Sequence, residues 1–161
     1  MTRNNDLVVA LSVKLCHNKG CKLIDLKGGR NMAEQQELLT VATAMLDKAY
    51  TPYSHFHVGA AAVGASGKIY GGCNIKNASF GATNCAERTA IFSGIAAGET
   101  HFTALLVTGN TDGPIAPCGI CRQVIAEFFD ADAPIYLTNQ KGAFTATTVA
   151  AILPGAFTDL N

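Results

Sequence analysis

The chain has 161 residues, enough for one domain with a single hydrophobic core but not for two domains of ordinary size. Apolar residues make up 48% of the sequence and charged residues 15%, a composition that excludes an intrinsically disordered chain. Twelve basic residues balance twelve acidic ones, so the net charge favours neither a nucleic acid nor a membrane surface as partner. We therefore expect a globular protein that binds neither of these.

The first 31 residues differ from the rest of the chain. They have no sustained periodicity and end in a polar, glycine-containing run at positions 27–31. Their longest apolar stretch, Leu7–Val13, is far shorter than the roughly twenty residues that span a bilayer, and no signal-peptide pattern is clear. We expect residues 1–31 to form a flexible N-terminal extension, residues 32–161 to form the functional domain, and the protein to be cytoplasmic.

Periodicity predicts the elements of the domain in chain order. Apolar positions at helical spacing indicate a first helix over 34–50, which Thr51 and Pro52 would end. Two strands at 58–65 and 69–75 follow, with a hairpin turn at Ser66-Gly67. The remaining expected elements are a helix at 85–97, a strand at 104–109, a helix at 118–129, strands at 135–138 and 145–149, and a helical turn at 150–153. This order is typical of an α/β fold, a three-layer α/β/α sandwich with a central mixed five-stranded sheet.

Six cysteines could form disulfides, bind a metal or fill the core, and their spacing separates them into two groups. Cys118 and Cys121 form a C-x-x-C motif at the start of a predicted helix, and Cys85 stands at the start of another. Cys73 has no such context, and we expect it to be a buried strand residue. Cys16 and Cys21, with His17, could hold a metal only with a fourth ligand that nothing nearby supplies, so an incidental tail explains this stretch better.

The first group carries the chemistry. Two cysteines in C-x-x-C at a helix start place their sulfurs on one face, and the helix N-terminus favours their thiolate forms. With Cys85 they would supply three thiolates to Zn²⁺ and leave the fourth tetrahedral position to water, the arrangement of a catalytic zinc site. Glu87 is better suited to carry protons than to bind the metal. Arg88 and Arg122 could offset the negative charge of three thiolates.

Two other interpretations of these cysteines remain open. The C-x-x-C motif could be a redox pair, although its surroundings are not thioredoxin-like and Cys85 would then be unexplained. A closed structural zinc site would need a fourth protein ligand, for which His55 or His57 is available in the sequence.

The motifs C-A-E-R at Cys85–Arg88 and P-C-G-I-C-R-Q at Pro117–Gln123 together resemble the short, homotetrameric zinc-dependent cytidine deaminases. The resemblance runs from about Met32 to Phe157. It includes P-Y-S-H-F-H-V-G-A-A from Pro52, G-C-N-I-K-N-A-S-F from Gly72 and L-P-G-A-F ending at Phe157.

The resemblance implies hydrolytic deamination of cytidine and deoxycytidine in pyrimidine salvage, with one zinc ion per subunit held by Cys85, Cys118 and Cys121. It implies that Glu87 shuttles protons while activated water attacks C4 of cytosine and ammonia leaves, and that Arg88 bonds to the zinc thiolates. By the same likeness, the substrate contacts are Phe56 at the base, Asn74 at the ribose, the backbone of Ala86 at the pyrimidine, and Phe157 lent to a neighbouring subunit of a homotetramer. For Phe56 and Phe157, simple core packing is the other interpretation.

The sequence departs from the family pattern at two positions. Where the family usually reads N-x-E-N, with the glutamate accepting a hydrogen bond from the ribose 3′-hydroxyl, this chain has Lys76. Lysine only donates hydrogen bonds, so we expect a looser grip on the sugar unless Lys76 turns to solvent. Phe80 stands where a tyrosine is common. Two alternative functions follow: a same-fold aminohydrolase for modified or non-ribosyl cytosine compounds, and a catalytically silent zinc-stabilised protein.

Overall fold

The computed structural model describes residues 32–158. The predicted N-terminal extension, with Cys16, His17 and Cys21, lies outside these residues. The described elements are α2 (Met32–Leu46), β1 (Val58–Gly64), β2 (Ile69–Cys73), the 3₁₀ turn η1 (Phe80–Ala82), α3 (Ala86–Ala96), β3 (Phe102–Gly109), α4 (Gly119–Phe128), β4 (Pro134–Thr138), β5 (Phe144–Thr148) and α5 (Val149–Ile152). Within this range, no helix is long and apolar enough to cross a membrane.

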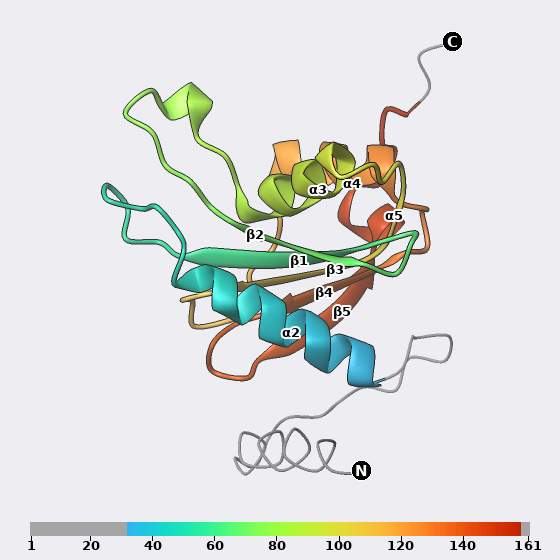
Figure 1. Ribbon diagram of the computed structural model, residues 1–161, viewed down its shortest axis with the longest axis horizontal. Coiled ribbons are helices and arrows are strands. Elements are labelled where there is room, and N and C mark those ends of the chain that lie inside the picture. Colours follow the sequence, from blue (N-terminus) through green and yellow to red (C-terminus); the bar gives the residue numbers. More distant parts are fainter. Residues whose placement is uncertain (1–31, 159–161) are drawn as a thin grey trace, which may run out of the picture.

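The five strands form one sheet in the order β2-β1-β3-β4-β5. β1 pairs with both β2 and β3 in antiparallel fashion, β3 and β4 run parallel, and β4 and β5 are antiparallel. The predicted mixed five-stranded sheet is therefore confirmed. Figure 1 shows α2 on one face of this sheet and α3, α4 and α5 on the other, which makes the fold a three-layer α/β/α sandwich.

Two hydrophobic clusters, one on each face of the sheet, hold the layers together. The central strands β1 and β3 are almost entirely buried, so their side chains alternate between the two clusters. The cluster under α3, α4 and α5 includes Ala86, Ala90, Ile91, Leu105, Ile125 and Ile135. The cluster under α2 includes Leu38, Ala42, Ala61, Leu106 and Tyr136.

Glycines let the helices approach the sheet closely. A Cβ atom on Gly59 of β1 would lie 2.0 Å from the carbonyl oxygen of Ala42 in α2. A Cβ atom on Gly72 of β2 would lie 2.4 Å from the carbonyl oxygen of Ala86 in α3. Both distances are far inside van der Waals contact, so a side chain at either position would force the layers apart.

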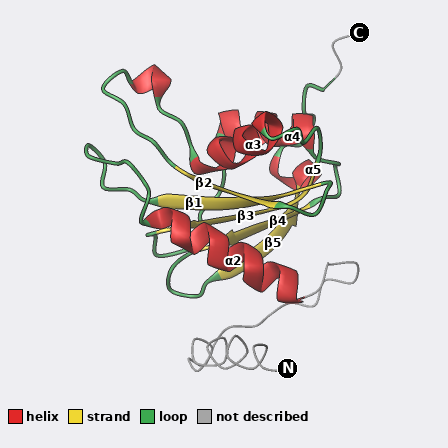
Figure 2. Cartoon of the chain, in the orientation of Figure 1, coloured by secondary structure: helices red, strands yellow, loops and turns green. Residues whose placement is uncertain are grey.

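The first helix ends earlier than its periodicity predicts. It stops at Leu46 rather than Tyr50, because the backbone N–H of Tyr50 donates to the carbonyl of Asn74 instead of continuing the helical ladder. Tyr50 also forms a parallel bridge with Ile75, which extends the β2 edge of the sheet. The strand predicted to reach Ile75 ends at Cys73, and the other boundaries agree within two residues. The loops that this bridge joins project together at one end of the sheet (Figure 2).

Candidate metal centre and substrate site

The topology of the sheet brings two helix N-termini together. Since β2 and β3 are both antiparallel to β1, they run in the same direction, and β4 runs parallel to β3. The chain therefore makes two crossovers on one face, through α3 and α4, and both helices start at the carboxyl-end edge of these strands. Cys85 is the N-cap residue of α3, Cys118 is the N-cap residue of α4, and Cys121 lies in the first turn of α4.

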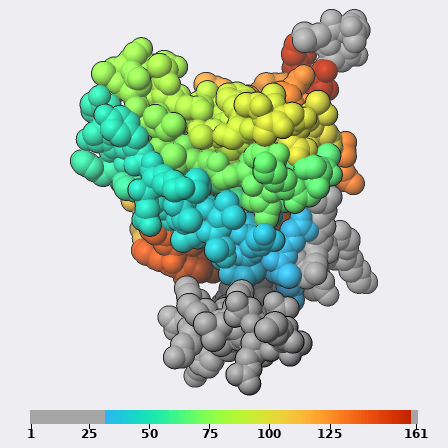
Figure 3. All heavy atoms as spheres, viewed as in Figure 1, coloured from blue at the N-terminus to red at the C-terminus, as the bar shows by residue number. Residues whose placement is uncertain are grey.

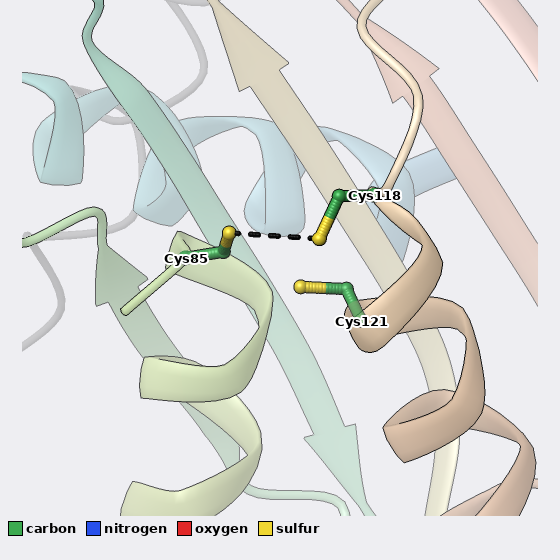
Figure 4. A group of neighbouring side chains, drawn as sticks. All are labelled: Cys85, Cys118 and Cys121. Atoms are coloured by element: carbon green, nitrogen blue, oxygen red, sulfur yellow. Dashed lines mark hydrogen bonds between the residues drawn. The ribbon is translucent and has the colours of Figure 1, made fainter. Parts of the chain in front are cut away.

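The three sulfurs converge between these helices, as Figure 4 shows. All three Sγ atoms lie within 4.8 Å of one another, and those of Cys85 and Cys118 are 3.8 Å apart. Two thiolates on one tetrahedral zinc ion, each at about 2.3 Å, would be about 3.8 Å apart. The spacing and the donor type of the cluster therefore fit Zn²⁺.

The cluster already favours negative charge. The neighbouring thiol of Cys121, with help from Arg88 and Cys118, lowers the pKa of Cys85 to about 5. The same pairing, with burial adding to it, raises the pKa of Cys121. Nη2 of Arg88 lies 3.8 Å from the Cys85 sulfur and also donates to the carbonyl of Thr83 at 3.1 Å. Desolvation acts against the cation, but these sulfur contacts outweigh it and raise the pKa of Arg88.

Glu87 lies beside the thiolates but outside the cluster of metal-ligating atoms. Only 4% of its surface is exposed, and burial, with the charge of Cys85 adding to it, raises the pKa of the carboxyl to about 7. A carboxyl group with this pKa can both accept and release a proton near neutral pH. This is the property that the sequence analysis required of a proton carrier.

No fourth protein ligand joins the cluster within residues 32–158. His57 is occupied elsewhere, because its Nδ1 lies 3.0 Å from the carbonyl oxygen of Leu46. His55 is exposed in the loop before β1, and its carbonyl accepts a hydrogen bond from Asn110. Three thiolates with one position left open correspond to a catalytic zinc centre rather than a closed structural one.

Two residues singled out in the sequence have contacts away from the cluster. Arg122 donates through Nε to the carbonyl of Pro117 and through Nη1 to the carbonyl of Ile152, at 2.9 Å in both cases. It therefore joins the start of α4 to the end of α5. Cys73 is half-buried rather than buried, and its sulfur donates to the carbonyl of Lys48 at 3.3 Å.

The predicted base and ribose contacts meet in one loop. The side chain of Asn74 is buried, accepts a hydrogen bond from the Val58 N–H at 3.0 Å and donates to the Phe56 carbonyl at 2.7 Å. Phe56 is 38% exposed, so it is not a core residue. Asn74 keeps one amide hydrogen and one oxygen lone pair beyond these two bonds.

The other predicted contact residues lie at the same end of the sheet or in the C-terminal segment. Lys76 is half-buried, and its backbone N–H donates to the Tyr50 carbonyl at 2.7 Å. Ala86 is the first residue of α3, where backbone N–H groups lack intrahelical acceptors. Phe157 is 67% exposed, and its carbonyl accepts a hydrogen bond from Gln123 at 2.7 Å. Phe80 is 80% exposed.

Sequence reasoning missed Asn110 and Gln123. Asn110 bonds to residues on both sides of Phe56, and Gln123 holds the segment that carries Phe157. Asn110 directly follows a strand and Gln123 lies inside a recognised motif, but neither position indicates the partner, which lies 34 or more residues away.

Comparisons with known proteins agree with this site. The family model described as the cytidine and deoxycytidylate deaminase zinc-binding region matches residues 32–137. A cytidine deaminase of Sporosarcina psychrophila is 52% identical over 122 residues, which are 76% of this chain and 90% of that protein. A cytidine deaminase of Halalkalibacterium halodurans is 46% identical over 130 residues, 80% of this chain and 98% of that protein.

Solved structures give the same result. The crystal structure of cytidine deaminase from Burkholderia pseudomallei matches with a TM-score of 0.73 and 50% identity, covering 76% of this chain and 98% of that one. That of the Mycobacterium tuberculosis cytidine deaminase matches with a TM-score of 0.66 and 32% identity, covering 76% of this chain and 96% of that one. The chain belongs to the zinc-binding cytidine and deoxycytidylate deaminase family, and the predicted family and fold are confirmed.

Proposed function

We propose that this protein hydrolyses cytidine and deoxycytidine to uridine and deoxyuridine with release of ammonia, in the salvage of pyrimidine nucleosides in the cytoplasm. As a member of its family with a three-cysteine cluster that could hold one metal ion, it is a zinc-dependent cytidine deaminase. The observation that carries the assignment is the cluster at two helix N-termini, with a buried carboxyl group beside it and no fourth protein ligand in residues 32–158. The two alternative functions are not favoured.

Cys85, Cys118 and Cys121 would hold the zinc ion, which when bound makes water a nucleophile at neutral pH. Glu87 would take up a proton at its carboxylate and deliver it to the cytosine ring or the departing amine. Burial of Glu87 supports this role, because it brings the pKa close to 7. Arg88 would offset the charge that three thiolates bring to the site.

The substrate contacts surround this centre. The ring of Phe56 would pack against the base, and the backbone N–H of Ala86 would donate to it. Asn74 would bond to the ribose through the amide hydrogen and lone pair that its two backbone partners leave available. Lys76, two residues further along the same extended segment, would face the sugar in place of the family's glutamate.

We also propose that four copies of the chain assemble and that Phe157 completes a neighbour's site. In support, several large apolar side chains are exposed on the single chain, which is typical of a surface that another subunit covers. They include Tyr50, Tyr53, Phe80, Phe92, Ile120 and Phe157.

Ammonia release from cytidine, deoxycytidine, cytosine and cytidine monophosphate tests the activity and the substrate class. Glu87→Ala is the control: it should abolish release while the zinc content, measured on the same sample, stays near one ion per chain. Ammonia release that is indifferent to this substitution would reject Glu87 as proton carrier.

Mixing two variants tests the shared site. Glu87→Ala and Phe157→Ala should each have little activity alone. Co-refolding them should restore activity, because some sites then combine an intact Glu87 with a neighbour's intact Phe157. Absence of recovery in mixtures that sedimentation shows to be tetrameric would place Phe157 within its own subunit's site or outside any site.

A further inference from the structure

The loop that leads from α2 into β1 carries Phe56 and contains an unusual backbone conformation. His55 has φ = 52°, and among the described residues it is the single non-glycine residue with positive φ. This left-handed region is unfavourable for a residue with a Cβ atom, so surrounding contacts must maintain it. In Figure 3 the loop lies on the surface at one end of the molecule, beside the segment that follows β2.

One side chain at the end of a distant strand bonds to the residues on both sides of Phe56. Asn110 directly follows β3, and its backbone N–H donates to the His57 carbonyl at 3.2 Å, which extends the pairing of β3 with β1. Its side-chain Nδ2 donates to the His55 carbonyl at 3.2 Å. Its Oδ1 accepts a hydrogen bond from the His57 N–H at 3.1 Å. Asn110 thus holds the residues immediately before and after Phe56.

Phe56 itself is held from the other side. Its carbonyl accepts a hydrogen bond from Asn74, at 2.7 Å, and its N–H donates to Ser54 Oγ at 3.3 Å. With the backbone fixed at residues 55, 56 and 57, the direction of the Phe56 Cα–Cβ bond is fixed as well. Only the staggered rotamers about this bond remain open to the partly exposed ring, on a backbone that Asn74 and Asn110 hold from two sides.

We propose that Asn110 is a positioning residue for substrate binding: it holds the left-handed turn at His55 and so fixes the ring of Phe56 for packing against the pyrimidine base. The inference rests on the proposed function, in which Phe56 contacts the base. Asparagine suits this position because the two neighbours require one donor and one acceptor, which aspartate or alanine cannot both supply.

Steady-state kinetics test the inference first. Asn110→Ala should raise KM for cytidine about five- to tenfold and leave kcat within about twofold, since the ring acts on substrate and transition state alike. Asn110→Asp keeps the acceptor for the His57 N–H and should have a smaller effect. The matched control is Asp112→Ala, in the same loop between β3 and α4. The side chain of Asp112 pairs with Lys141 instead. Equal KM values for Asn110→Ala and this control would overturn the inference.

A second readout does not depend on activity. The sequence contains no tryptophan, so Phe56→Trp introduces a single fluorophore at the position in question. Adding Asn110→Ala should lower the fluorescence anisotropy of this tryptophan and increase its quenching by acrylamide, whereas adding Asp112→Ala should change neither. No response to Asn110→Ala would refute the positioning role even if the enzyme is fully active. If the unsubstituted protein releases no ammonia while the tryptophan responds clearly, the positioning role is supported and the proposed function is rejected.

A double-mutant cycle separates the two side-chain bonds of Asn110. In a His55→Gly background the left-handed conformation is readily accessible, so the bond to the carbonyl of residue 55 is needed less. The effect of Asn110→Ala on KM should then be at least about twofold smaller than in the original background. An undiminished effect would show that the turn at His55 is not what Asn110 maintains.

Discussion

Replacing Lys76 by glutamate should raise the kcat/KM of the enzyme for cytidine. Tyr50 and Asn84 bridge Ile75 on its two sides, so the segment around it is extended and the side chains of Asn74 and Lys76 lie on the same side. Asn74 is the proposed ribose contact, and Lys76 is half-buried beside it. A carboxylate there could accept a hydrogen bond from the 3′-hydroxyl, which the lysine cannot do.

The expected gain follows from this degree of burial. A hydrogen bond to a charged group contributes about 1.5 to 3 kcal/mol, and partial exposure of the site favours the lower end of that range. We therefore expect Lys76→Glu to raise kcat/KM for cytidine roughly tenfold without altering the zinc content.

Initial rates of ammonia release over a range of cytidine concentrations measure this gain. Lys76→Gln separates loss of the positive charge from gain of an acceptor, and Lys68→Glu makes the same charge change at the opposite end of β2. With 3′-deoxycytidine, which lacks the hydroxyl, the advantage of Lys76→Glu should disappear. Indistinguishable kinetics of the two forms, or an equal gain with 3′-deoxycytidine, would refute the proposed contact.

Three further predictions concern charge and stability. In protein stripped of metal, burial raises the pKa of Glu87 to about 7 from 4.5, so its contribution to folding is present below pH 4.5 and is lost as the pH rises towards 7. This loss lowers the free energy of unfolding by about 3 kcal/mol across that pH interval, and in Glu87→Gln it should be absent. Denaturant unfolding at several pH values measures it, and an equal fall in both proteins would contradict the prediction. Zinc uptake at pH 7 should release the proton of Cys121, whose pKa is raised, whereas Cys85 is already a thiolate. A pH indicator in weak buffer measures this release. Zero protons released per zinc ion would argue against the assigned charges. Arg122→Met loses both bonds to backbone carbonyls and should lower the free energy of unfolding by about 1.5 to 3 kcal/mol, a change that a fully solvated arginine would not produce.

Local signals in the sequence were enough to predict the sheet and the metal cluster. Helical periodicity and turn residues mark the elements, and Cys85 and Cys118 can be recognised because each stands at the boundary where a helix begins. Once both helices are crossovers on the same face, their N-termini must come together, so the topology of the sheet brings the three cysteines into one cluster. The low exposure of Glu87 follows from its place in the first turn of α3, next to the buried Ala86.

The contacts that local signals could not predict join distant parts of the chain. Nothing near Tyr50 indicates that its N–H bonds to Asn74 rather than continuing α2, so periodicity alone predicts the wrong end for this helix. Arg122 follows a cysteine of the cluster, which suggested an electrostatic role, but its guanidinium reaches the carbonyl of Ile152, 30 positions away. The partners of Asn110 precede it by 53 and 55 positions. Hydrogen bonds of this kind have no periodicity, and only the folded structure reveals them.

An ion held by this cluster would also act as a cross-link. Cys85 lies on one crossover and Cys118 on the next, 33 positions along the chain. If a cross-link of that span persists in the unfolded chain, it restricts the ensemble as a covalent bridge would, by about 4 kcal/mol in chain entropy. If it breaks on unfolding, the full binding energy of the metal opposes the transition instead. In either case the centre that activates water would also fasten α3 to α4, and a chelator would shorten the lifetime of the fold as well as stop the reaction.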